Sequence, residues 1–407
     1  QTRATPTADG SAYVLNGEKR YITNGGIAHV LTVMARTPVP GSPDTKVTAF
    51  LVTPDLPGFE VVEARMPKCG IRGTATAKLA FHDMPVPAEN VLGPVGKGLR
   101  VALTVLDFGR TTFGASCTGA AKTCLRAACE HAKRRVQFKQ PLAEFELVKK
   151  KIAFMAANAF AMEATTSVCA SFIDSGAEDY MLETAMLKVW STDALWQIVN
   201  DTLQIYGGQG YFCDEPYERM MRDARINLIG EGANDVLRGF IALVGMRGVG
   251  EQLKGVLDAV KSPSKWATLW QFGRSQVETR LSTPEVPVAS ASFKPEAKRL
   301  AKRVRDFGLA VQAVLRKHRE AVLQMQYLQE RIADSACDLY ASSCTLSRLD
   351  HLLTAAGNGN PADTARDVQA GRYFLALADR RIRQNLAALD DNDDALTTRT
   401  ADAVLGR

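Results

Sequence analysis

A long apolar helical pattern ends at the glycine cluster Gln204-Ile-Tyr-Gly-Gly-Gln-Gly-Tyr211. The pattern begins near Asp179 and runs to Tyr206, where Gly207 and Gly208 supply a helix end because glycine adopts backbone angles that other residues avoid. A dinucleotide-binding glycine motif would follow a strand and not a helix. The cluster therefore argues against a doubly wound α/β fold and favours helices packed on helices.

Two more apolar stripes precede this pattern. They consist of Leu106, Phe113, Cys117, Ala120 and Cys124, and of Val148, Ile152, Met155, Ala159 and Met162. Each stripe has the spacing of one apolar face of an α-helix. Long helices with short joints form bundles. We therefore expect a four-helix-bundle domain over residues 96–250.

Residues 1–95 instead alternate short β-rich runs with turns. The strand candidates are Ala12–Leu15, Lys19–Ile22, His29–Ala35, Val47–Thr53, Phe59–Val62 and Lys78–Phe81. Asn16-Gly17, between the first two, predicts a hairpin turn whose central residues have positive φ. Several short strands without intervening helices predict an antiparallel β-barrel-like or sandwich domain.

Beyond the bundle, the sequence predicts a connecting region over 251–297 and an extra C-terminal helical domain over 298–407. The run 282–297 is rich in Pro, Ser and Ala and is typical of a linker. After it, an apolar helical stripe extends from Val311 to Leu339, and a last helix is expected over Thr364–Leu389. The overall expectation is a mainly α protein with one β domain.

The connecting region also contains an amphipathic segment, residues 253–274, that mixes basic residues with aromatic ones. Basic residues beside interfacial aromatics suit a helix that lies on a membrane surface. Alternatively, Trp266 and Trp270 anchor a helix on the C-terminal domain. Both interpretations stay open.

Composition excludes several other classes. The chain has 407 residues, is 46% hydrophobic and 23% charged, and carries a net charge of +6. It contains no run of about 18 apolar residues and no basic run interleaved with aromatics, so neither a spanning helix nor nucleic-acid binding is expected. Eight cysteines without a CxxC pair indicate buried free thiols in a reducing compartment and no metal site.

The segment richest in reactive groups is Arg222-Asp-Ala-Arg-Ile-Asn-Leu-Ile-Gly-Glu231-Gly-Ala-Asn-Asp-Val236. Glu231 lies between two glycines after an apolar run. Desolvation there would raise the pKa of its carboxyl group, as a general base near neutrality requires. The alternative is a carboxylate at a helix start, favoured by the helix dipole. The spacing alone does not decide between the two.

Several motifs together carry a family likeness. They are Tyr21-Ile-Thr-Asn-Gly25, Gly70-Ile-Arg-Gly73, Val86-Pro-Ala-Glu-Asn-Val-Leu-Gly93, Gly96-Lys-Gly98, Arg135-Val-Gln-Phe138 and Gln204–Tyr211, with Asp214, Arg219 and Asp223 at matching spacings. Over about residues 11–250 the sequence resembles the acyl-CoA dehydrogenase family. Within that family, the C-terminal region with Lys317-His318 resembles the branch of the very-long-chain enzyme and its complex I assembly paralogue.

The resemblance implies FAD-dependent oxidation of long or very long acyl-CoA to trans-2-enoyl-CoA in fatty acid β-oxidation. Glu231 falls on the position of the family's catalytic base, which removes the α-proton while a hydride passes from the β-carbon to flavin. Some relatives carry the base one residue before the Arg of an Asp-x-x-Arg motif, where this chain has Gly109. Asp107 and Arg110 match that motif, whose members contact CoA.

The resemblance further implies which residues bind the remaining groups. The flavin positions are Tyr21, Thr23, Arg135, Phe138, Gln204, Gly207 and Gly208, and Gly230 and Gly232 adjoin the acyl substrate. In the family the flavin is held across a subunit boundary, so a homodimer is expected. Electron-transferring flavoprotein is the expected electron acceptor. The compartment would be bacterial cytoplasm or the mitochondrial matrix and inner membrane.

Some positions depart from the family pattern. Gly230 stands where an aromatic residue is usual, Ala233 where a flavin-contacting Thr is usual, and Lys139 and Glu146 replace a Gly and a Gln. The family's N-terminal helical domain and its T-E-P-x-A-G-S-D segment are not found, so the chain is expected to be N-terminally incomplete. The alternative function is a non-catalytic assembly or scaffold protein derived from such an enzyme.

Overall fold

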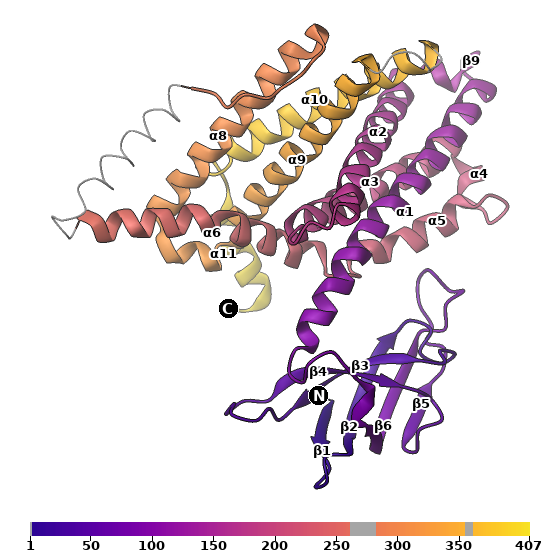
Figure 1. The fold of residues 1–407 in the computed structure, drawn as a ribbon. Helices are drawn as coiled ribbons and strands as arrows, with labels where there is room; N and C mark the ends of the chain where they lie inside the picture. Colours follow the sequence, from indigo (N-terminus) through magenta and orange to yellow (C-terminus); the bar gives the residue numbers. More distant parts are fainter. Residues whose placement is uncertain (1, 261–281, 355–360) are drawn as a thin grey trace. The chain divides into compact units, whose positions relative to one another are not determined.

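The computed structural model describes residues 2–260, 282–354 and 361–407 (Figure 1). The chain divides into two compact units, residues 1–109 and 110–407. The first is a β unit and the second is helical. The predicted amphipathic segment 253–274 lies largely outside the described residues.

The β unit is built on one seven-stranded sheet with the order β5-β6-β2-β1-β3-β4-β7. Its strands are β1 Arg3–Pro6, β2 Ala12–Ile22, β3 Leu31–Thr37, β4 Lys46–Val52, β5 Phe59–Glu63, β6 Ala77–Pro87 and β7 Val91–Leu92. Neighbouring strands are antiparallel except β1 and β3, which pair in parallel. Leu15, Phe50 and Phe81 form its buried core. The antiparallel β domain is thus confirmed, with one parallel pair.

The predicted hairpin at Asn16-Gly17 is wrong. β2 runs without a turn through both residues, and its register against β6 shifts between Leu15 and Gly17. The Asn16 side chain donates to Asp83 Oδ1 at 3.0 Å, while its own Oδ1 accepts from the Asp83 backbone N–H at 2.9 Å. The positive φ that the sequence suggested is therefore used in a β-bulge, which adds a residue to one strand.

The helical unit begins within α1. Its main helices are α1 Gly98–Arg134, α2 Glu146–Asp174, α3 Met181–Tyr206, α5 Tyr217–Ala224, α6 Asn234–Val260, α8 Lys294–His318, α9 Gln326–Thr354, α10 Pro361–Ala387 and α11 Asp394–Leu405. Shorter elements are β8 Val136–Gln137, β9 Gln140–Pro141, α4 Gly208–Tyr211 and the 3-10 turns η1 Ala88–Asn90, η2 Leu142–Glu144, η3 Arg225–Leu228, η5 Ala291–Phe293 and η6 Arg319–Gln324. One core runs through α1, α2, α3, α6 and α9, because each presents an apolar stripe to its neighbours.

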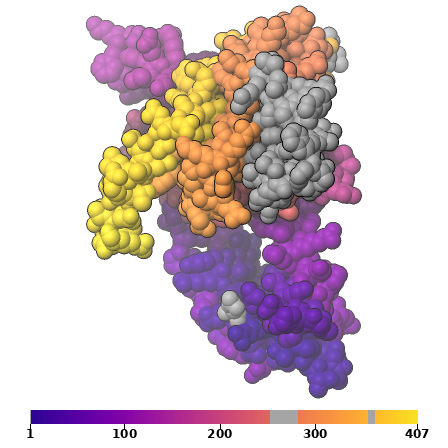
Figure 2. Space-filling view, turned by 90° about the vertical axis from the view of Figure 1, so that its left-hand side faces the viewer, coloured from indigo at the N-terminus to yellow at the C-terminus, as the bar shows by residue number. Residues whose placement is uncertain are grey.

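The C-terminal helices α8, α9 and α10 pack together (Figure 2). This region differs from the expectation at three places. The predicted linker 282–297 is helical from Lys294, and Phe293 is fully buried. The stripe from Val311 to Leu339 is not one helix, since Arg319 has a φ of 50° and starts a 3-10 turn. The predicted last helix is followed by another, α11.

Helix α2 is long and apolar enough to cross a membrane by length and composition. Its mean hydropathy is 1.2 over an 18-residue window although polar residues interrupt the apolar ones, so the absence of an unbroken apolar run did not reveal it. However, 56% of that window is buried inside the protein. We interpret α2 as the core helix of the bundle, which passes the same test.

The cysteines are free thiols, as expected, but not all are buried. Cys117, Cys124, Cys169, Cys337 and Cys344 are buried, whereas Cys69 and Cys213 are exposed and Cys129 is half-buried. Among the described residues, no group of three or more His, Cys, Asp or Glu side chains is arranged to hold a metal ion.

Candidate active site

Glu231 lies on the short loop between η3 and α6. It has a φ of 57°, and Gly232 follows with a φ of 95°, so two successive residues adopt the left-handed region. The reversal separates the η3 turn from the start of α6. Its Oε2 atom is buried and makes no hydrogen bond with the described residues. Burial raises the pKa of the carboxyl group.

Two cations from neighbouring helices act on this carboxylate. Arg110 on α1 is 5% exposed and Lys188 on α3 is fully buried. The positive charges of both lower the pKa of Glu231, but less than burial raises it. The structure therefore brings together the predicted base and the predicted arginine, and adds a lysine. Burial therefore favours the protonated carboxyl group of Glu231, and the two cations partly oppose this by stabilising its charged form.

Lys188 is the residue that sequence reasoning missed. Its Nζ donates to the Gly232 carbonyl at 2.7 Å and to Asn234 Oδ1 at 2.8 Å, so it ties the residues just after Glu231. Burial lowers the pKa of Lys188 to about 8. A signal was present, because a lysine within the apolar run Met186–Trp190 is unusual on the buried face of a helix.

The glycine turn ends α3 as predicted. Gly207 has a φ of 62° and a ψ of −138°, angles that residues with a side chain rarely adopt. A Cβ built at Gly207 or Gly208 would meet nothing within 4 Å, so this backbone is bare on its outer side. Beneath the turn, the rings of His131 and Tyr206 stack with centroids 4.1 Å apart. The bundle thus holds an exposed glycine backbone on a rigid base.

The other predicted flavin residues are also exposed. Gln204, Arg135 and Phe138 lie at the surface of the helical unit, and Phe138 is 87% exposed with a φ of 48°. In the β unit, Tyr21 is 68% exposed with a φ of 64°, and Thr23 is exposed. A positive φ at a bulky aromatic residue is uncommon, because its side chain strains the backbone in that region. These positions are consistent with surfaces that a ligand or a second subunit covers.

The remaining predicted residues lie close to Glu231 in the sequence or on α1. Asp107 is half-buried, one turn before Arg110 on the same helix. A Cβ at Gly230 would make an ordinary contact, 3.6 Å from the Ile226 carbonyl oxygen. A Cβ at Gly232 would lie 3.2 Å from Leu237. Gly230 thus has room for a Cβ atom, whereas a Cβ at Gly232 would press on Leu237 and adopt a strained φ.

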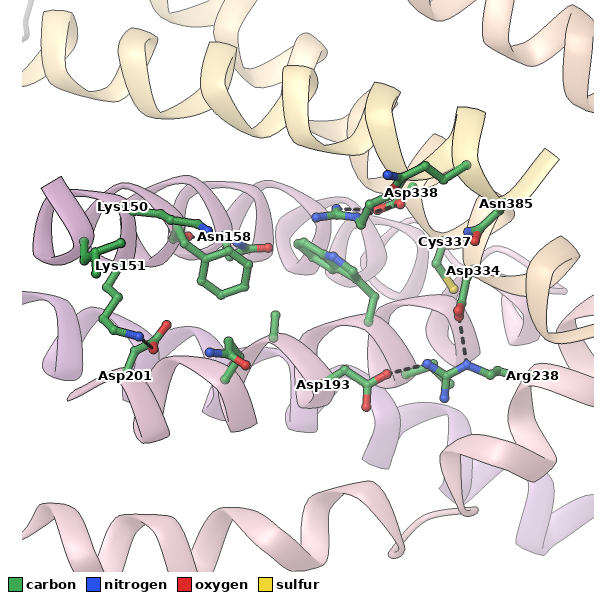
Figure 3. A pocket seen from close by; sticks show the side chains of 18 residues that line it. Lys150, Lys151, Asn158, Asp193, Asp201, Arg238, Asp334, Cys337, Asp338 and Asn385 are labelled. Carbon is green, nitrogen blue, oxygen red and sulfur yellow. Dashed lines mark hydrogen bonds and ion pairs between the residues drawn. The ribbon is translucent and has the colours of Figure 1, made fainter. Parts of the chain in front are cut away.

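A cavity of about 700 Å³ lies elsewhere in the helical unit, between α2, α3, α6, α9 and α10 (Figure 3). It contains none of the predicted site residues. Arg238 lies on its wall and donates to Asp193 at 2.6 Å and to Asp334 at 2.8 Å. Arg381 makes two bonds to Asp338, at 2.6 and 2.8 Å. The charges that line the cavity are thus largely engaged with each other.

Comparison with family models identifies the class. The acyl-CoA dehydrogenase C-terminal domain matches residues 96–245 and the middle domain of the same family matches residues 1–84. The chain belongs to the acyl-CoA dehydrogenase family. The ACAD9/ACADV C-terminal domain matches residues 291–404, which assigns the extra helical region to the branch predicted from the sequence.

Individual proteins agree with this assignment. The chain is 35% identical to the mitochondrial very long-chain specific acyl-CoA dehydrogenase of Homo sapiens, over 96% of this chain and 60% of that protein. It is 32% identical to the "Probable acyl-CoA dehydrogenase FadE10" of Mycobacterium tuberculosis, over 99% of this chain and 64% of that protein. The crystal structure of an acyl-CoA dehydrogenase complexed with FAD from Bacillus anthracis aligns with a TM-score of 0.81 and 28% identity. The alignment covers 100% of this chain and 69% of that one. The chain thus spans about 60% of the length of the curated relatives it matches.

Proposed function

We propose that the full-length protein is an FAD-dependent acyl-CoA dehydrogenase for long or very long acyl chains in fatty acid β-oxidation. Glu231 removes the α-proton of the thioester and holds it on its carboxyl group. The β-carbon loses a hydride, and a trans double bond forms between the two carbons. When bound, FAD supplies the acceptor for that hydride.

The observation that carries this proposal is the state of the Glu231 carboxylate. Oε2 is buried without a hydrogen bond to the described residues, and burial raises the pKa of the group. A structural carboxylate would be satisfied by N–H donors or cations in direct contact. An unsatisfied oxygen is instead available to a C–H acid, and a base with a raised pKa matches a proton donor better near neutral pH.

The residues proposed to bind FAD fit that group. The bare backbone at Gly207 and Gly208 leaves room for a close approach, and Arg135 offers a guanidinium that suits a pyrophosphate. Phe138 and Tyr21 offer exposed aromatic faces, and Thr23 offers a hydroxyl. In this proposal, Gln204 completes the set on the helical unit. Because family members share such a site between subunits, we propose a homodimer.

The substrate proposal rests on the family and on α1. Asp107 and Arg110 occupy the Asp-x-x-Arg positions that contact CoA in relatives, and Gly230 and Gly232 flank the base along the acyl chain. Long or very long chains are proposed because the C-terminal region belongs to the very-long-chain branch. Electron-transferring flavoprotein is proposed as the electron acceptor.

The test is an anaerobic titration of the full-length protein with palmitoyl-CoA, followed at the flavin band. Bleaching with formation of enoyl-CoA is the expected result. Glu231→Gln should keep bound FAD but lower the rate of bleaching by roughly a thousandfold, as expected for loss of a general base. The matched control is Glu251→Gln, which removes an exposed glutamate of α6.

Two outcomes would contradict the proposal. A yellow protein that no acyl-CoA bleaches would favour the non-catalytic assembly function. Equal bleaching by wild type and Glu231→Gln would keep the dehydrogenase but remove Glu231 as its base.

A further inference from the structure

The loop that presents Glu231 is held by a lysine that touches no solvent. Lys188 has none of its surface exposed. Taking an ammonium group out of water is costly, and a methionine of similar length would fill the same space without that cost. The two hydrogen bonds of Lys188 are directed at the Gly232 carbonyl and at Asn234 Oδ1, on either side of the start of α6.

The acceptor Asn234 continues the network. Its Nδ2 donates to Asp193 Oδ1 at 2.8 Å and to Thr192 Oγ1 at 3.0 Å, both on α3. The other oxygen of Asp193 accepts from Arg238, and Arg238 in turn donates to Asp334 on α9 (Figure 3). A chain of buried and partly buried hydrogen bonds therefore connects the loop of the base with a helix of the C-terminal region.

We propose that Lys188 is a positioning residue for the reaction assigned to Glu231, fixing the left-handed loop through Gly232 and Asn234 and placing a positive charge beside the carboxylate. This inference rests on the proposed function. The network through Asp193 and Arg238 to Asp334 keeps Lys188 and its acceptors in register with α9. The C-terminal region thus supports the catalytic loop as well as adding a domain.

The charged groups around both residues give the direction of the effect. Glu231 faces Arg110 from α1 and Lys188 from α3. Lys188 faces Asp193, Arg110, Cys117 and Glu231. Since the charge of Lys188 lowers the pKa of Glu231, its removal should raise that pKa. The base must be ionised to act, so the acidic limb of the rate profile should move to higher pH.

The experiment measures flavin reduction in stopped flow, under saturating acyl-CoA, from pH 5 to 9 in the full-length holoprotein. Lys188→Met removes the charge and the donors, and should lower the plateau rate roughly ten- to a hundredfold and move the acidic limb to higher pH. Lys188→Gln keeps donors without the charge. It should show the same shift with a smaller loss of plateau rate.

A third variant tests the position alone. Asn234→Ala keeps Lys188 but deletes one of its acceptors, so the plateau rate should fall without movement of the limb. Lys122→Met is the matched control, because Lys122 pairs with Glu163 at the surface of the bundle. It should leave both parameters unchanged.

The outcomes separate the inference from the function beneath it. Suppose that wild type reduces flavin and that the acidic limb of the rate profile lies at the same pH in the Lys188 variants. Lys188 is then merely structural and the inference is overturned. If the Lys188 variants do not fold, an unchanged plateau in Asn234→Ala overturns it. If wild type itself never reduces flavin, the proposed function fails first, and the inference fails with it.

Discussion

Two regions of the helical unit bury charge in opposite ways. Around the cavity, Asp338 is 3% exposed and receives two bonds from Arg381, while Arg238 joins Asp193 to Asp334. At the loop after η3, Glu231 has a buried oxygen without a hydrogen bond to the described residues. Buried ionic groups that serve the fold are paired, because an unpaired charge is expensive. Glu231 differs in that Arg110 and Lys188 act on it through their charge while its Oε2 makes no direct hydrogen bond with the described residues, which leaves that oxygen available for chemistry.

The comparison also separates cavity size from function. The 700 Å³ cavity is large enough for a ligand, yet Asp193, Asp334 and Asp338 on its walls are already neutralised by arginines. A large pocket is a reasonable default for a binding site. Here the reactive group lies outside it, and the ion pairs of the cavity join α3 and α6 to the C-terminal helices.

Breaking the paired region should have the largest effect on stability. Arg381→Met leaves the Asp338 carboxylate buried without its guanidinium, and should lower the free energy of unfolding by about 3 kcal/mol. Urea denaturation at pH 7, monitored by far-ultraviolet circular dichroism, measures the difference in the free energy of unfolding from wild type. Because a protonated Asp338 carries no charge, the deficit should shrink as the pH falls.

A double replacement is the control for this prediction. Arg381→Met with Asp338→Leu removes both charges together and should recover most of the lost stability. If the single and double variants are equally unstable, packing and not charge pairing joins α9 to α10.

The two glycines beside Glu231 offer a second, intermediate contrast. Gly232 has a φ of 95° and a Cβ there would lie 3.2 Å from Leu237, so Gly232→Ala should cost about 1–3 kcal/mol. Gly230 has room for a Cβ, so Gly230→Ala should change stability by less than about 0.5 kcal/mol. Thermal unfolding of the two variants side by side measures the difference. Equal melting temperatures would mean that the loop relaxes freely.

Local signals explain which features were predictable. The end of α3 at Gly207 depends on adjacent residues and was predicted correctly, as was the burial that raises the pKa of Glu231. The bulge at Asn16-Gly17 depends on Asp83, 67 residues away, and a turn-like dipeptide could not reveal that partner. The break at Arg319 is likewise invisible, because the apolar stripe continues on both sides of it.

The charge partners were hidden for the same reason. Helical periodicity identifies a buried face, but it does not tell which side chain of another helix lies opposite. In the sequence, Lys188 is a single charged residue within an apolar run, and its acceptors 44 and 46 residues further on are brought to it only by the fold. Arg110, which a family motif singled out, does act on Glu231 in the structure, because a family pattern encodes long-range contacts that a single sequence does not express.

The smallest expected effect on stability concerns Glu231, on the loop between η3 and α6. Glu231→Gln removes a carboxylate whose buried oxygen makes no hydrogen bond with the described residues, so the free energy of unfolding should change by less than about 1 kcal/mol. Activity should nevertheless collapse.

The pH dependence of this small stability difference between Glu231→Gln and wild type follows from linkage. Because the pKa of Glu231 is raised in the folded protein, wild type loses stability as the pH rises from the ordinary glutamate value of 4.5 through the raised one. The glutamine variant lacks this loss, so it should gain relative to wild type between pH 4 and pH 8 in urea titrations. A variant that is instead destabilised by as much as Arg381→Met would show that Glu231 is a structural carboxylate after all, and the contrast between the two regions would collapse.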